Sequence, residues 1–249
     1  MKNQIILWLS SLVILFLIGY IKNVTDKNYP ITGTFGIEGY KVSYKLDKVS
    51  NEKSTYKNII ISDIKGVTGK IIWFRDDERY ETEMIEIDRR LTGEIPVFKA
   101  GQKINYKIEL AYKNKIYNLP QKDFVTLTFW GHIPSAIKIL HFIFLYGGML
   151  MVIRSSFELF NQNKNLKKYI VITSALFLIL NIIINPLRNS YKLGAINNYV
   201  PPVLDLLEPG YLTILFLWVV GTILIFNNKM QSTVTIITSA ATIIIFFLL

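Results

Sequence analysis

Two ionisable side chains, Lys138 and His141, lie inside an apolar segment, residues 133–153, that is long enough to cross a membrane. Their spacing of three residues places them on one face of a helix. A lysine can extend its stem to the membrane boundary, whereas a neutral imidazole in lipid needs a hydrogen-bond partner. Because an ionisable group within a span marks a functional site by default, His141 is a candidate for proton-, quinone- or ligand-linked chemistry. The alternative is a structural hydrogen bond to a neighbouring helix or loop.

The connection at residues 187–209 carries further charges that could face these two residues. It is longer than most connections between helices, and its VLDLLE segment, after Pro201-Pro202, predicts a short interfacial helix. We therefore hypothesise an outward-facing pocket. An enzyme acting on lipid or glycan stays an alternative, with Asp205 and Glu208 as the paired carboxylates near the outer membrane face. The residues expected in the pocket are Lys138, His141, Arg188, Asp205 and Glu208.

The chain has few side chains that could bind a metal or a haem. It has no cysteine and only two histidines, His132 and His141. A helix between them would separate them by about 13 Å, so they cannot bind one iron together within one chain. The sequence predicts no cofactor and no metal site, with a haem or quinone near His141 as the alternative. The acidic cluster at residues 76–83 lacks a calcium-loop pattern and has interleaved arginines, which favours a solvated hairpin tip.

Five apolar segments are candidates for spanning helices, each near the roughly 20 residues that a bilayer requires. The third is the shortest, so we expect it to tilt or to be flanked by snorkelling side chains. The last four would form a four-helix membrane domain, residues 133–249. The segments are Ile5–Ile21, Ile133–Ile153, Tyr169–Ile184, Gly210–Phe226 and Ser232–Leu249.

The basic residues predict the orientation. The connection Arg154–Lys168 contains four basic residues and one acidic residue, Glu158. Cytoplasmic loops are enriched in lysine and arginine, so we place this connection on the cytoplasmic side of a bacterial inner membrane. The N-terminus is then cytoplasmic, and residues 30–130 and the C-terminus are extracytoplasmic. Residues 1–22 have an apolar core longer than that of a signal peptide, which favours an uncleaved signal anchor over a cleaved peptide.

The polar part of the chain, residues 30–130, predicts strands. Apolar and polar residues alternate in Tyr40–Leu46 and in Lys103–Tyr112, which is typical of strands with one wet face. Four more such segments follow from 56–64, 69–75, 81–88 and 125–130. Turn residues at short intervals favour an antiparallel β-sandwich of the immunoglobulin or fibronectin-III type. The fold class expected for the whole chain is therefore an α+β membrane protein.

The net charge of +10 does not indicate a nucleic-acid partner. Residues 30–132 are nearly balanced, with 17 of the 28 basic residues and 14 of the 18 acidic residues. The excess positive charge lies in the connections between apolar segments, where it sets membrane orientation. The partners that we expect are the lipid bilayer and other membrane protein subunits.

Residues 66–160 carry a series of short motifs that continue into the second apolar segment. Their order resembles an uncharacterised family of multi-pass membrane proteins from Bacteroidetes-type bacteria. The resemblance implies an external β-sandwich that passes rigidly, through a turn at Gly131–Pro134, into a helix carrying His141. It implies no established activity. The motifs are GKIIWFR, MIEIDRRLTGEIP, AGQKINYKIEL, NLP, FWGHIP and RSSFEL.

The sequence favours a non-enzymatic role. No phosphate-binding loop, dinucleotide fingerprint, zinc-protease motif or nucleophile elbow occurs in the chain. We therefore expect an interaction or accessory subunit of a membrane complex. A redox, quinone- or haem-linked subunit using His141 is the first alternative. A ligand sensor or small transporter with a pocket near Lys138 and His141 is the second.

Overall fold

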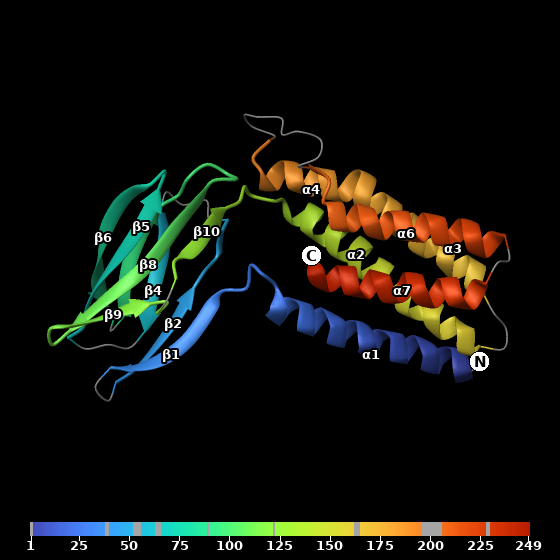
Figure 1. Cartoon of the computed structure of the whole chain (residues 1–249), viewed down its shortest axis with the longest axis horizontal. Helices are drawn as coiled ribbons and strands as arrows, with labels where there is room; N and C mark the ends of the chain where they lie inside the picture. Colours follow the sequence, from blue (N-terminus) through green and yellow to red (C-terminus); the bar gives the residue numbers. More distant parts are fainter. Residues whose placement is uncertain are drawn as a thin grey trace. The chain divides into compact units, whose positions relative to one another are not determined.

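The protein is described from a computed structural model, shown in Figure 1. The chain is α+β and divides into two compact units, a helical unit and a unit made of strands. The helical unit comprises Met1–Asp26, Ile133–Tyr191 and Ala195–Leu249, and the strand unit comprises Lys27–His132 with Lys192–Gly194. The residues that the structure describes are 2–37, 40–51, 56–62, 66–88, 90–121, 123–161, 165–195, 206–227 and 230–249.

Within this described part, five helices are long and apolar enough to cross a membrane, as the sequence predicts. The third differs from its prediction. It runs over Leu166–Lys192, 27 residues, rather than the short segment Tyr169–Ile184. The helical segments are α1 (Lys2–Thr25), α2 (Ser135–Phe157), the 3₁₀ turn η1 (Glu158–Phe160), α3 (Leu166–Ile179), the π-helical η2 (Leu180–Ile184), α4 (Asn185–Lys192), α6 (Pro209–Phe226) and α7 (Gln231–Leu248).

The π-helical segment η2 lets the third helix continue past Pro186. A proline inside a helix lacks an N–H donor and crowds the carbonyl one turn before it. Here the backbone N–H of Asn185 donates to the carbonyl of Leu180, which is the wider π spacing. The helix therefore reaches Lys192, and the first six residues of the connection expected at 187–209 are helical.

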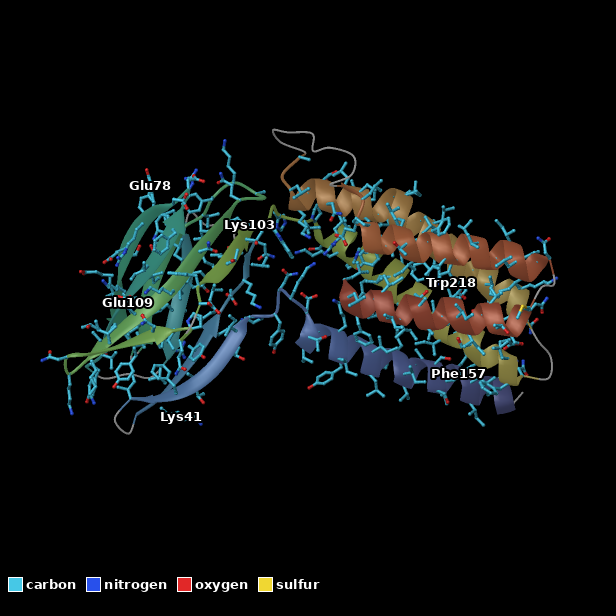
Figure 2. All side chains as sticks on the ribbon, viewed as in Figure 1. Lys41, Glu78, Lys103, Glu109, Phe157 and Trp218 are labelled. Atoms are coloured by element: carbon cyan, nitrogen blue, oxygen red, sulfur yellow. The ribbon has the colours of Figure 1, made fainter. Side chains whose placement is uncertain are left out.

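Small and hydroxyl side chains bring the helices of the bundle together. A Cβ at Gly148 would lie 2.9 Å from the ring of Phe177, so α2 and α3 approach closely there. The sequence predicts such a contact point at Gly147 and Gly148, and Gly148 provides it. Trp218 is fully buried in the bundle, between α6 and α7 (Figure 2), and its indole N–H donates to the Thr242 hydroxyl at 2.9 Å.

A buried ion pair joins three helices at one end of this bundle. Arg154 on α2 and Glu158 on η1 are both 0% exposed, and their side chains approach to 2.7 Å. The guanidinium also donates to the side-chain oxygen of Gln4 on α1, and it lies 4.7 Å from the ring centre of Tyr169 on α3. Glu158 accepts the backbone N–H of Asn165 at 2.7 Å. The pair therefore fixes α1 and the start of α3 against α2.

Replacing one partner of this pair should be costly, because the other charge is left buried. We expect Arg154→Met to lower the free energy of unfolding by about 3–5 kcal/mol. Adding Glu158→Gln, which keeps an acceptor for the Asn165 N–H but removes the charge, should restore much of that loss. Unfolding of the detergent-purified chain measures both variants, with the exposed Lys168→Met as the control. A double variant no more stable than Arg154→Met would contradict the argument.

The strand unit is one curled, mixed sheet. Its neighbour order is β1-β2-β4-β7-β6-β5-β8-β10-β3, and β9 pairs with β8. Among the described residues, every strand pair is antiparallel except β10 with β3, which departs from the antiparallel prediction. The strands are β1 (Ile31–Ile37), β2 (Tyr40–Leu46), β3 (Val49–Ser50), β4 (Tyr56–Ser62), β5 (Thr68–Arg75), β6 (Glu78–Ile87), β7 (Arg90–Pro96), β8 (Lys103–Tyr112), β9 (Lys115–Leu119) and β10 (Val125–Phe129).

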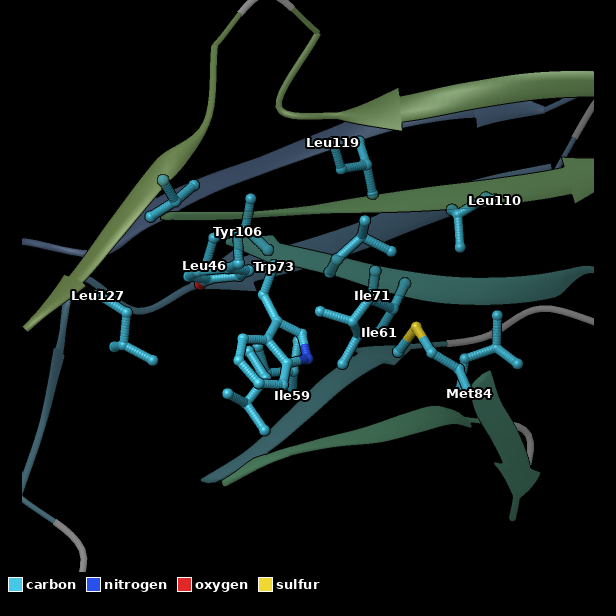
Figure 3. Close-up of a cluster of buried hydrophobic side chains, with 14 of the residues drawn as sticks. Leu46, Ile59, Ile61, Ile71, Trp73, Met84, Tyr106, Leu110, Leu119 and Leu127 are labelled. Carbon is cyan, nitrogen blue, oxygen red and sulfur yellow. The ribbon is translucent and has the colours of Figure 1, made fainter. Parts of the chain in front are cut away.

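Strand β6 connects the two halves of the sheet. Its residues Glu78–Met84 pair with β5, and its residues Ile85–Ile87 pair with β7. The sheet curls around one apolar core, to which both halves contribute side chains (Figure 3). Ile61 comes from β4, Ile71 and Trp73 from β5, and all are buried. The unit therefore needs no disulfide to hold its two halves together.

The acidic cluster forms a hairpin tip, as the sequence favours. Asp76 and Asp77 have positive φ angles of 49° and 65°, so they alone form the turn between β5 and β6. The predicted connection of five residues is therefore only two residues long. The carboxylates nearby pair with cations: Asp76 lies 3.3 Å from Arg75, and Glu81 lies 3.0 Å from Lys70.

Gly93 on β7 leaves the space that Ile71 of the facing half occupies. A Cβ at Gly93 would lie 2.5 Å from the Ile71 Cδ1 atom. We expect Gly93→Ala to destabilise the strand unit by about 1–3 kcal/mol through overpacking. The same change should cost less in an Ile71→Val background, which lacks that atom. Hydrogen exchange of the β5 and β7 amides measures the difference, and equal costs in both backgrounds would refute the contact.

Candidate functional site

A cavity of about 380 Å³ lies in the helical unit, at the end where α1 and α4 finish and α2 and α6 begin. It brings together three of the residues that the sequence places in a pocket, Lys138, His141 and Arg188. Glu208 lies beside it through its contact with Arg188, and Asp205 lies outside the described residues. The lining residues are Lys22, Asn23, Asp26, Lys138, His141, Phe142, Leu145, Tyr146, Arg188, Tyr211 and Phe246.

Helix α2 supplies the central wall of the cavity. Pro134 precedes this helix in an extended conformation and lets it begin at Ser135, so Lys138 falls in its first turn and His141 in its second. Lys138 is exposed and His141 is half-buried. The imidazole stands edge-on to the ring of Tyr211, with 6.3 Å between ring centres. The histidine is therefore held against α6 while one face of it lines the cavity.

Helix α1 supplies a wall that the sequence analysis missed. Lys22 and Asp26 follow its apolar stretch at a spacing of four residues, and their side chains pair at 3.6 Å. The Lys22 side chain is only 14% exposed. The signal for these residues was present, since charges at this spacing just beyond an apolar stretch occupy one helical face. The spacing does not show which helices α1 packs against, so it could not place these residues at a pocket.

Arg188 reaches the cavity from α4. Its guanidinium lies 3.5 Å from the carboxylate of Glu208, and its side chain is 21% exposed. The backbone carbonyl of Glu208 accepts the first hydrogen bond of α6, from the N–H of Leu212 at 3.2 Å. The carboxylate therefore stands at the positive end of the α6 dipole, which also favours a negative charge there.

The cavity favours an anion. Three basic side chains, Lys22, Lys138 and Arg188, line it, against the single lining carboxylate of Asp26. Lys22 and Arg188 each have a carboxylate within 4 Å, whereas the structure gives Lys138 none among the residues that it describes. The rest of the wall is largely aromatic and aliphatic, and a low-dielectric wall strengthens the attraction between these cations and an anionic group.

Over the described ranges, no three side chains of the His, Cys, Asp and Glu types come together at metal-binding distance. His132 belongs to the strand unit and His141 to the helical unit. A haem or quinone at His141 stays a prediction.

The predicted junction contains the boundary between the two units, which falls after His132. Gly131 belongs to the strand unit, where its N–H donates to the Lys192 carbonyl at 2.8 Å. Pro134 belongs to the helical unit and precedes α2. Both residues therefore have local structural roles, and the rigidity expected of the junction stays a prediction.

A second cavity, of about 430 Å³, lies on the strand unit around Lys70 and Glu109. Its charges are already paired, because Lys70 contacts Glu81 at 3.0 Å and Glu109 at 3.5 Å. Hydrogen bonding from Lys107, with help from Lys70, lowers the pKa of the Glu109 carboxyl. These groups satisfy one another, so this cavity is the weaker candidate for a charged ligand.

Comparisons with protein-family models, curated proteins and solved structures find no match to this chain. The resemblance of residues 66–160 to a bacterial membrane family stays a prediction, and the site is interpreted from its own geometry.

The absence of cysteine makes the exposure of the cavity directly measurable. We expect Lys138→Cys to react rapidly with a water-soluble maleimide, because Lys138 is exposed at the cavity. Met149→Cys, on the same helix, should react slowly, since Met149 is 0% exposed. Both cysteines should react equally after unfolding in detergent, which serves as the control. Equal rates in the folded protein would contradict the described packing of α2.

Proposed function

We propose that this chain is an integral membrane protein that binds an anionic ligand at the outer end of its helical unit. The observation that carries the proposal is the cavity of about 380 Å³ in which Lys22, Lys138 and Arg188 meet His141. This corresponds to the ligand-binding alternative from the sequence. It ranks above the accessory-subunit expectation because five helical segments, α1, α2, α4, α6 and α7, converge on the cavity.

Snorkelling alone is a weaker explanation for these cations. A lysine that only extends to the membrane boundary keeps its charged end in water. The side chains of Lys22 and Arg188 are 14% and 21% exposed, so both are largely enclosed by neighbouring groups. Enclosing cations beside an apolar wall is costly unless an anion compensates them. Asp26 and Glu208 compensate Lys22 and Arg188, and a bound anion would compensate Lys138, which has no carboxylate within 4 Å among the described residues.

The proposed orientation follows from the basic connection between α2 and α3. Lys167 and Lys168 begin α3 and are exposed at the end of the helix opposite to Arg188. If this connection is cytoplasmic, the cavity opens to the outside of a bacterial inner membrane. The strand unit would then also be extracytoplasmic. Its curled sheet and shared core support an assignment as a sandwich of the immunoglobulin or fibronectin-III type.

A second candidate function, the accessory subunit, is favoured by strand β1. This strand pairs with β2 along seven residues and, in the part of the chain described, with no other strand. Its sequence ITGTFGI contains no charge or proline that would protect an edge. Such an edge can accept a strand from a partner protein. A partner retained in mild detergent, lost with Thr34→Lys and kept with the control Thr126→Lys on β10, would support this role.

The anion-binding proposal is tested with inorganic phosphate as the probe. The full chain is purified in a neutral detergent, freed of lipid, and its thermal unfolding followed as phosphate replaces chloride at constant ionic strength. We expect phosphate to raise Tm, because it binds the folded cavity and not the unfolded chain. Lys138→Gln should abolish most of the rise. The exposed lysine variant Lys168→Gln, at the other end of the bundle, should keep it. An equal rise in both variants would reject the cavity as the site.

A further inference from the structure

An apolar groove adjoins the cationic cavity on the surface of the helical unit. It has a volume of about 490 Å³ and lies between α1 and α2. The groove and the cavity share two lining residues, Phe142 and Tyr146, so they form one continuous surface. The groove is lined by Leu15, Phe16, Gly19, Tyr20, Phe142, Ile143, Tyr146, Gly147 and Leu150.

Tyr146 marks the boundary between the polar and the apolar parts. Its ring packs against Phe142, with 4.7 Å between the ring centres. A Cβ at Gly19 would lie 3.2 Å from the Tyr146 ring, so the glycine allows α1 to pass close beside it. From Phe142 to Leu150 the groove follows α2 for about 12 Å toward the interior of the membrane. Charges lie at one end of this surface, and the other end is wholly apolar.

Resting on the proposed anion site, we propose that the ligand is a membrane lipid with an anionic headgroup. The headgroup lies in the cavity beside Lys138 and Arg188, and one acyl chain lies in the groove. Charge complementarity selects the headgroup, because a zwitterionic lipid would bring an ammonium group toward three cations. Continuity with the apolar groove selects a lipid over a small soluble anion, since burying each CH₂ of a chain contributes about 0.8 kcal/mol.

The experiment measures lipid affinity and phosphate binding separately. Native mass spectrometry of the full chain in neutral detergent gives apparent affinities for phosphatidylglycerol and phosphatidylcholine. We expect a preference for phosphatidylglycerol that Lys138→Gln reduces about fivefold, since one basic residue near a membrane surface contributes about 1 kcal/mol. Equal affinities for the two lipids in the unmodified chain would overturn the proposal.

Variants of the groove test whether the acyl chain binds there. Gly147→Leu fills the groove from a position where an added Cβ meets only ordinary contact, 3.9 Å from Leu176. It should lower the affinity for phosphatidylglycerol about tenfold, the equivalent of two CH₂ groups left unburied. Ile143→Ser, at a position 53% exposed, tests the same groove without loss of core packing. The matched control is Ala136→Leu, an exposed position on α2 outside both surfaces.

The outcomes separate this inference from the proposed function. Loss of lipid affinity in both groove variants, with the phosphate-induced rise in Tm retained, supports the lipid. Unchanged lipid affinity in both groove variants, with the phosphate effect still present, overturns the lipid and leaves the anion site. Absence of a phosphate effect in the unmodified, delipidated chain rejects the anion site, and the lipid proposal fails with it.

Discussion

The guanidinium of Arg154 is the contact on which the arrangement of the helical unit depends. Helix α1 exposes most of its apolar surface and has few buried residues of its own. Gln4, Glu158 and Tyr169 meet Arg154 at one end of the bundle, and this fixes how far α1 is shifted along α2. Lys22 lies 18 residues further along α1, about 27 Å away. The position of one wall of the cavity therefore follows from a polar contact at the opposite end of the same helix.

The proposed site combines a charged part and an apolar part of the helical unit. The polar half of the proposed site uses residues near the ends of several helices, where charged side chains reach the membrane boundary. The apolar half uses only α1 and α2, further from the helix ends. Tyr146 belongs to both halves, because its ring covers the groove and its residue also lines the cavity. Recognition of an amphiphile needs this combination, which neither half provides alone.

Much of the membrane part could be predicted from hydropathy, because a span of apolar residues has few alternatives to a helix. The length of the third helix was not predicted. Pro186 and the polar residues after it read as the start of a connection, while Asn181, Asn185 and Asn189 are in fact buried at helical spacing. Within the site, Lys138, His141 and Arg188 could be named from the sequence. Lys22 and Asp26 carry a local signal in their spacing of four residues, but nothing local shows which neighbours α1 has, so the sequence could not place them at the pocket.

Two of the strands that the sequence analysis missed, β1 and β7, share a physical cause. In β1 and β7 the inward positions include Gly33 and Gly93, so the alternation of apolar and polar residues is interrupted. A Cβ at Gly33 would lie 2.5 Å from the Tyr44 hydroxyl oxygen, and Gly93 is crowded in the same way. Inward glycines of this kind make room for a large neighbour, which lies far away in sequence or on another strand. Periodicity alone cannot show such a partner.

The π-helical segment η2 has a consequence for the direction of every side chain that follows it. A π turn takes in one residue more than an α turn, which changes the helical phase of the later residues by about 100°. Arg188 lies about one turn after η2, so its orientation toward the cavity depends on that additional residue. If Leu180–Ile184 formed a regular α-helix without losing a residue, the guanidinium would point at another sector of the bundle. The π turn in this segment, as well as the identity of Arg188, therefore determines the charge of the cavity.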